Sequence, residues 1–120
     1  MNFITTFLTL QNQLRIFHWQ TEEYSQHKAF GEAYENLDEL IDSFIEEFMG
    51  KYGKIRSQEQ MNISIKNIDE VNPNQFIENI IKFFTIDLQS FLKEEDTNLL
   101  NIRDTIVSEL RELKYLLQLK

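Results

Sequence analysis

The chain has 120 residues, of which 42% are hydrophobic and 27% charged, and this length suits one domain with a hydrophobic core. Three glycines and one proline are too few for the many turns of a β-sandwich or barrel, so long helices are favoured. Acidic residues outnumber basic ones by 20 to 12, and the net charge of −8 argues against nucleic acid as the main partner. The lack of cysteine excludes disulfides, thiolate nucleophiles and cysteine-bound zinc.

The N-terminal segment, residues 1–17, predicts neither a signal peptide nor a membrane span. It has no basic leader, and Thr, Gln and Asn interrupt its apolar residues. We therefore expect an intracellular, cytoplasmic protein without a membrane partner, folded as a single domain over residues 1–120.

Two helices are predicted in the first half of the chain. Apolar residues recur at intervals of three and four from Phe3 to Phe17, which predicts a helix over about residues 3–21. A longer helix is predicted over about residues 25–50, with Ser25 as its N-cap. Gly50 or Gly53 is expected to end it.

The helical period is lost between residues 54 and 72, where Met61, Ile63 and Ile65 alternate with polar residues. This pattern fits either a short extended segment or a packed loop.

Two more helices are predicted in the second half. The Asn72-Pro73 pair is typical of a helix start and predicts a third helix over about residues 73–93. The Asp96-Thr97 pair is expected to cap a fourth over about residues 97–119.

The spacing of the four helices predicts their connections. Short gaps join the first helix to the second and the third to the fourth, so each pair is expected to form an antiparallel hairpin. The longer segment between the hairpins acts as a crossover. The predicted fold class is therefore all-α, a ferritin-like four-helix bundle with one long crossover between helices two and three, and a generic four-helix bundle is the alternative.

The only two histidines, His18 and His27, flank the turn of the first hairpin, and the sole tryptophan, Trp19, follows His18. Each histidine alone is more simply a half-buried side chain at the end of a core. Two at the same end of a hairpin also suit a metal site, because imidazole is a common metal ligand.

Asp42 and Glu46 lie one turn apart on the second helix, where they can share a cation or belong to a solvated acidic face. Because His27 and Asp42 are fifteen residues apart, roughly 22 Å along a helix, they cannot bind one ion within one chain. Two copies of this helix packed antiparallel about a two-fold axis would bring them together. Mixed histidine and carboxylate ligands suit iron, with zinc or manganese as alternatives.

Several stretches of the sequence resemble the mini-ferritins of the Dps family, the DNA-protection-during-starvation proteins. They are Phe17-His18-Trp19, His27-Lys28-Ala29-Phe30 and Leu40-Ile41-Asp42-Ser43-Phe44-Ile45-Glu46-Glu47. The resemblance implies a ferritin-like subunit and an iron-oxidation centre between two-fold-related subunits. It implies His18 and His27 of one subunit and Asp42 and Glu46 of the other as iron ligands and catalytic residues.

The resemblance also has departures. Gly31 stands where the family usually has a carboxylate, and the interval between the two histidines is shorter than the family's. Glu22 or Glu23 in the turn would compensate, whereas Glu32 points elsewhere on the helix. Trp19 is implied to be the aromatic residue beside the iron, with packing at a dimer interface as its simpler role.

The function expected on these grounds is iron binding or iron oxidation by a homo-oligomer, at least a two-fold dimer, with a larger cage left open. Such a protein would be a ferroxidase that oxidises Fe(II) with peroxide or dioxygen and protects against oxidative stress. The alternative is a ferritin-like structural or interaction protein that has lost metal chemistry. We expect no nucleic-acid partner, because the chain lacks the basic N-terminal arm that holds DNA in many Dps proteins.

Overall fold

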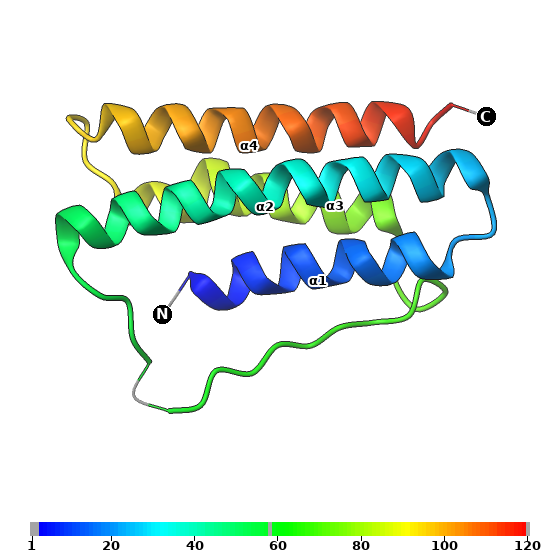
Figure 1. Ribbon diagram of the computed structural model, residues 1–120, viewed down its shortest axis with the longest axis horizontal. Helices are drawn as coiled ribbons and strands as arrows, with labels where there is room; N and C mark the ends of the chain where they lie inside the picture. The colour runs from blue at the N-terminus through cyan, green and yellow to red at the C-terminus, as the bar shows by residue number, and fades with distance from the viewer. Residues whose placement is uncertain (1–2, 58, 120) are drawn as a thin grey trace.

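The computed structural model describes residues 3–57 and 59–119, and this part of the chain is all-helical with four α-helices (Figure 1). The helices are α1 (Ile4–Gln20), α2 (Tyr24–Tyr52), α3 (Pro73–Lys82) and α4 (Thr97–Leu116). After α3 the chain continues through a π-helical segment, η1 (Phe83–Asp87), and a 3-10 segment, η2 (Leu88–Phe91). The residues described include no β-strand, and no helix among them combines the length and apolar composition that a membrane span needs.

The helices lie side by side, and helices that are neighbours in space run antiparallel. Figure 1 shows α1 and α2 running antiparallel, and α3 and α4 likewise, while α2 packs against both α1 and α4. The connector, residues 53–72, runs back along the whole length of the molecule past α1. The helices that it joins, α2 and α3, therefore run in the same direction.

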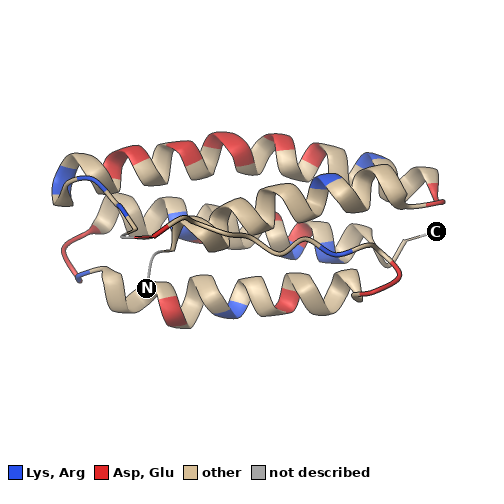
Figure 2. Ribbon diagram, turned by 90° about the horizontal axis from the view of Figure 1, so that it is seen from below, with Lys and Arg blue, Asp and Glu red and all other residues tan. Residues whose placement is uncertain are grey.

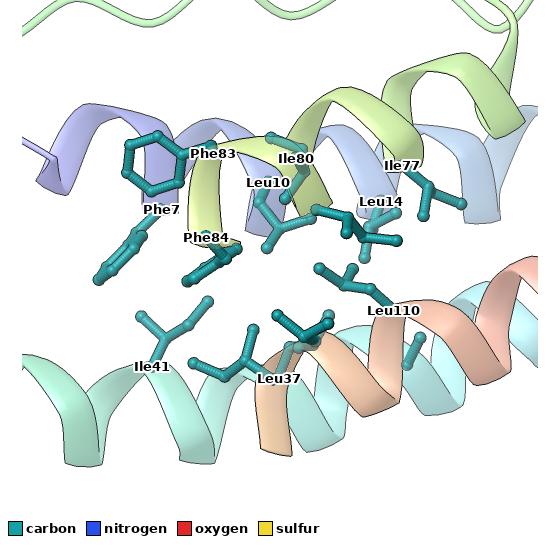
Figure 3. Packing of buried hydrophobic residues seen from close by; sticks show 14 of the residues in the cluster. Phe7, Leu10, Leu14, Leu37, Ile41, Ile77, Ile80, Phe83, Phe84 and Leu110 are labelled. Atoms are coloured by element: carbon teal, nitrogen blue, oxygen red, sulfur yellow. The ribbon is translucent and has the colours of Figure 1, made fainter. Parts of the chain in front are cut away.

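The core between the helices is rich in phenylalanine. The Phe7 side chain is fully buried, and its ring stacks on Phe84 with centroids 5.3 Å apart and an interplanar angle of 12°. Phe44 of α2 and Phe83 of η1 contact Phe7 edge-on. Aliphatic residues from all four helices fill the rest of this core (Figure 3), including Leu10, Leu14, Leu37, Ile41, Ile77, Ile80 and Leu110.

Two of the predicted helix ends are confirmed. The Asn72 side chain accepts a hydrogen bond of 3.1 Å from the Gln75 N–H, and Pro73 is the first residue of α3. Gly53 ends α2 with a φ of +91°, a left-handed conformation that glycine adopts without steric cost.

The predicted N-cap of α2, Ser25, is wrong by two residues. The helix begins at Tyr24 with Glu23 as N-cap, so Ser25 lies inside the first turn and caps nothing. The chain turns through the extended conformations of Thr21 and Glu23, and this places the helix start earlier than the serine indicated. Helix α4 ends at Leu116, three residues before the predicted end.

The third helix was predicted as one continuous helix to residue 93, but its winding changes after Lys82. Two side chains bond to carbonyls here, one in the last turn of α3 and one in η1. Thr85 Oγ1 donates to the Ile81 carbonyl at 2.9 Å, and Arg103 Nη1 of α4 donates to the Phe84 carbonyl at 3.3 Å. These side chains supply donors to carbonyl groups where the winding of the helix changes.

The connector is held to α1 by two glutamine side chains. The amide of Gln13, a buried residue, donates to the Lys66 carbonyl at 2.8 Å and accepts from the Lys66 N–H at 2.9 Å. Gln20 accepts from the Ile68 N–H at 2.8 Å. The two glutamine side chains thus make hydrogen bonds to the connector backbone of the kind that a neighbouring strand would make. The side chains of Met61 and Ile63, which alternate with polar residues in the connector, remain exposed.

Asp96 joins the C-terminal end of α2 to the start of α4. It occupies the N-cap position of α4, as predicted, but its carboxylate makes no bond to the helix. It pairs with Lys51, accepts from the Tyr52 hydroxyl at 2.5 Å and accepts from the Lys93 N–H at 2.8 Å. The bonds from Lys51 and Tyr52, and then the backbone bond at Lys93, lower the pKa of this fully buried carboxyl from 3.8 to about 2.

The lowered pKa of Asp96 predicts a specific acid sensitivity. A carboxyl that is more acidic in the folded state stabilises the fold above its unfolded pKa and loses this contribution as the pH falls. We expect Asp96→Asn to lower the free energy of unfolding at neutral pH, and the difference from wild type to shrink between about pH 4 and pH 2. Urea unfolding at several pH values measures this. The matched variant Glu94→Gln, at an exposed position, should show no such trend, and a difference that stays constant with pH would contradict the assignment.

Candidate functional site

The two histidines lie at one end of the α1–α2 hairpin. His18 is in the last turn of α1, and His27 is in the first turn of α2. The tight connection between them is stabilised by a bond of 2.9 Å from the Thr21 N–H to the Phe17 carbonyl and by one of 2.8 Å from Thr21 Oγ1 to Gln26 Oε1. The hairpin therefore places both imidazoles on one side of a rigid turn.

The two imidazole rings stack face to face. Their centroids are 3.8 Å apart and their planes differ by 17°. His18 Nδ1 lies 2.6 Å from the carbonyl oxygen of His27, and His27 Nδ1 lies 2.8 Å from the carbonyl oxygen of His18. Each histidine thus bonds through its side chain to the backbone of the other.

This reciprocal arrangement fixes the tautomer of both rings. A carbonyl oxygen can only accept a hydrogen bond, so each Nδ1 must carry the proton and donate it. In the neutral rings the lone pair then lies on Nε2, which no described residue bonds. An Nδ1–H bonded to a backbone carbonyl is the usual support of a histidine that binds metal through Nε2.

The stacking limits how the pair can bind a metal. The Nε2 lone pair of each histidine lies in its own ring plane, and a ligated metal sits in that plane about 2.1 Å from the nitrogen. The ring centroids are 3.8 Å apart and the rings are tilted by only 17°, so the two planes do not meet within that distance. This arrangement does not let both histidines chelate a single ion through Nε2, and it leaves each Nε2 free for an ion of its own.

Gly31, one turn after His27, is required by the position of the His18 ring. A Cβ atom at residue 31 would lie 3.1 Å from Nδ1 of His18 and 2.9 Å from Cε1, and the second contact is closer than Cβ atoms approach in proteins. Gly31 is itself buried. The glycine that departs from the mini-ferritin pattern therefore has a local reason in this chain, because it makes room for a histidine.

Aromatic side chains surround the pair. The His18 ring contacts the edge of Tyr34 with centroids 5.4 Å apart, and Tyr24 lies roughly parallel to His27 at 6.3 Å. The Arg15 guanidinium sits 4.7 Å from the centre of the Tyr34 ring and pairs with Asp38 at 2.5 Å. These contacts hold the α1 side of the site against α2.

Asp42 and Glu46 are not brought to the histidines within one chain. Both are exposed on α2, about 22 Å or more along the helix from His27. Within residues 3–57 and 59–119, no three His, Cys, Asp or Glu side chains lie close enough together to hold a metal ion. The two histidines and the two carboxylates therefore lie apart within the single chain.

The other predicted site residues are exposed. Trp19 is 67% exposed, and Glu22, Glu23 and Glu32 also face solvent near the histidine end of the hairpin. Acidic residues recur along the outer face of α2, the long helix at the top of Figure 2, and they are Glu32, Glu35, Glu39, Asp42 and Glu46.

Sequence reasoning identified both histidines but missed the residues that position them. Tyr34 and the Arg15–Asp38 pair touch or flank the site, and neither was singled out. The only sequence signal for them is spacing, since Arg15 lies three residues before His18 and Tyr34 three residues after Gly31, each about one helical turn away.

Comparison with known protein families assigns the chain to one family. Residues 18–117 match the family of unknown function DUF5856. The chain belongs to this family. The match begins at His18 and includes His27, Gly31, Asp42 and Glu46. No curated protein and no solved structure matches the chain.

Proposed function

We propose that this member of the DUF5856 family is an iron-binding and iron-oxidising protein with a ferritin-like subunit, and that its metal site is shared between two-fold-related copies. The observation that carries the proposal is the stacked pair His18 and His27. Each ring donates from Nδ1 to a backbone carbonyl and leaves Nε2 for a metal.

The arrangement of the helices supports the ferritin-like part of the proposal. Two antiparallel hairpins joined by a long connection, with α2 and α3 parallel, match the connectivity of ferritin-like bundles (Figure 1). The resemblance of the segments around His18, His27 and Asp42 to Dps mini-ferritins points to the same architecture.

The partner copy would supply the carboxylates. Asp42 and Glu46 form no hydrogen bond or ion pair with any described residue, and they lie on the exposed face of α2. An antiparallel α2–α2 contact about a two-fold axis near residues 34–37 would place them beside the histidines of the other chain. Each imidazole would then bind its own iron ion. One complete set of ligands, two histidines and two carboxylates, would therefore hold two iron ions.

The chemistry of this ligand set favours oxidation of Fe(II) as substrate. Carboxylates stabilise Fe(III) relative to Fe(II), and neutral imidazoles limit the negative charge of the site. With peroxide as oxidant, two Fe(II) ions each lose one electron, the O–O bond breaks, and two protons complete two water molecules. The acidic face of α2 would raise the local concentration of Fe(II) at the site.

Anaerobic Fe(II) titration by calorimetry tests the proposal when the mass of the assembly is measured on the same sample. We expect saturable binding of about one or two irons per chain on a dimer or larger oligomer. His27→Ala should remove the ion that His27 binds, about half of the saturable iron, and leave the helical circular dichroism unchanged, whereas Lys28→Ala, at the exposed neighbouring position, should bind like wild type.

Mixing two variants tests whether the site is shared. The double variant His18→Ala/His27→Ala and the double variant Asp42→Asn/Glu46→Gln should each fail to bind iron. In a mixed dimer one of the two sites regains every native ligand. Refolding them together in equal amounts should therefore restore about a quarter of the wild-type capacity. No recovery in a sample shown to contain mixed dimers would contradict a shared site.

The alternative is a structural or interaction protein in which the histidines only fasten the hairpin. The reciprocal Nδ1 bonds between α1 and α2 favour it, because they stabilise the turn without any metal. It predicts a well-folded oligomer without saturable iron binding, and a loss of stability as the sole effect of His27→Ala.

A further inference from the structure

A polar pocket, separate from the histidine pair, lies on the side of the molecule formed by η1, η2 and α4. Its volume is about 240 Å³. Two arginines contribute to its wall, together with two hydroxyl side chains and one carboxylate. The lining residues are Thr85, Gln89, Arg103, Asp104, Val107, Ser108 and Arg111.

Arg103 is held in a fixed orientation at this pocket. Its side chain is only 14% exposed. Nε donates to Asp104 at 2.7 Å, and Nη1 donates to Gln89 Oε1 at 2.8 Å and to the Phe84 carbonyl at 3.3 Å. A guanidinium has five N–H donors, and the two on Nη2 have no partner among the described residues. The Arg103 guanidinium is thus held in one orientation before any ligand binds, and its two Nη2 hydrogens are free to donate.

The change of winding after α3 makes this orientation possible. The π-helical segment η1 presents the Phe84 carbonyl to α4, where Arg103 binds it. Wide turns of this kind occur often at functional sites, because they free backbone groups from the regular helical pattern.

Arg111 gives the pocket a second positive charge. It lies two turns after Arg103 on α4, about 12 Å along the helix axis, and Val107 forms the buried floor between them. Arg111 is exposed and forms no hydrogen bond or ion pair within the described part of the chain. Among the described residues of the lining, Asp104 is the sole carboxylate and already pairs with Arg103, so this lining has a net positive charge in a protein of charge −8.

We propose that this pocket binds a small phosphorylated organic molecule, with phosphate oxygens accepting from the free Nη2 of Arg103, from Arg111 and from the Ser108 hydroxyl. Guanidinium forks match the spacing of phosphate oxygens and bind them in pairs. The apolar Val107 floor suits the carbon part of the ligand. The site is separate from the histidine pair and does not depend on iron binding.

The test uses inorganic phosphate and glycerol 3-phosphate as probes, with acetate as the carboxylate control, at constant ionic strength. Two-dimensional NMR of the isotope-labelled 120-residue chain follows the backbone amides and the arginine side chains. We expect saturable shifts at Arg103, Ser108 and Arg111 with both phosphates, tighter binding of glycerol 3-phosphate, and no saturation with acetate.

Matched arginine variants separate this site from a general charge effect. Arg111→Gln should weaken phosphate binding by about tenfold. Arg56→Gln removes the same charge from an exposed position in the connector and should change the affinity less than about twofold. Arg103 is left intact because it also binds the Phe84 carbonyl. Equal losses in both variants, equal binding of acetate, or no saturable shifts at this pocket would overturn the proposal.

Discussion

Alanine at position 31 is expected to remove the iron ion bound through His18, and so to lower the iron stoichiometry, while the helical fold is retained. The added methyl group would lie 2.9 Å from Cε1 of His18, and the backbone of α2 cannot move away without disturbing the buried residues around it. The His18 ring must therefore turn aside, which breaks its bond to the His27 carbonyl and the stacking of the two rings. The pair then no longer presents two oriented Nε2 atoms.

Gly50→Ala is the matched control for this prediction. It makes the same substitution in the same helix, but a Cβ atom at residue 50 would meet nothing within 4 Å. We expect it to bind iron like wild type and to gain about 0.5–1 kcal/mol in stability from the higher helix propensity of alanine. In Gly31→Ala the same gain is offset by overpacking, which costs about 1–3 kcal/mol.

Two measurements distinguish a failure of this mechanism from a failure of the proposed function. The nitrogen chemical shifts of the imidazoles report the tautomer and the Nδ1 bond without any metal. Displaced His18 shifts in Gly31→Ala together with a lower iron stoichiometry are the expected pair of results. Undisturbed His18 shifts would contradict the steric argument, whereas disturbed shifts in a protein that never bound iron would contradict the proposed function alone.

The helices that the sequence predicts best are those with a continuous apolar stripe. In α1 and α2 many of the residues at intervals of three and four, such as Phe7, Leu14 and Leu37, are fully buried. The pattern predicts which face is buried because it depends only on local geometry. The all-helical class and the four helices are therefore visible in the sequence.

The changes of winding in η1 and η2 are not visible in the same pattern. Phe84 and Leu88 keep a four-residue spacing and are fully buried, as they would be in a regular helix. The Phe84 carbonyl is bound by Arg103, nineteen residues away along the chain. A contact over that distance depends on the packing of α4 and leaves no periodic signal near Phe84.

For Asp96, too, the local sequence does not reveal the bonding partners of the side chain. Its position before Thr97 indicates a helix cap, and the structure does place it at the N-cap of α4. Its carboxylate instead binds Lys51 and Tyr52, which lie 45 and 44 residues earlier. Only the packing of the end of α2 against the start of α4 brings these partners together, so local sequence could not predict them.

The candidate site was predictable in its members but not in its geometry. A short turn between two antiparallel helices is enough to place His18 near His27. The reciprocal Nδ1 bonds depend on the rotamers of both rings, and Gly31 was interpreted as a missing ligand because nothing local shows that a ring occupies its space. Whether Asp42 and Glu46 complete the site depends on a second copy of the chain.

The largest loss of stability is expected from Phe7→Ala. This side chain is fully buried and contacts Phe44, Phe83 and Phe84, so its removal leaves a cavity between α1, α2 and η1. Truncation of a buried phenylalanine typically costs about 3–5 kcal/mol, a large part of the stability of a domain of this size. Urea unfolding followed by circular dichroism measures it as a lower midpoint with a similar slope.

Ile86→Ala, in η1, is the control for this variant. It also removes a large apolar side chain, but Ile86 is 66% exposed, and we expect a change within about 0.5 kcal/mol. Phe7 lies eleven residues before His18, about 16 Å along α1, so Phe7→Ala should keep its iron affinity under conditions where it remains folded. A loss below about 1 kcal/mol would mean that α1 is not packed on η1 through this ring, and a loss of iron affinity in the folded variant would mean that the phenylalanine core also positions the histidine end of the hairpin.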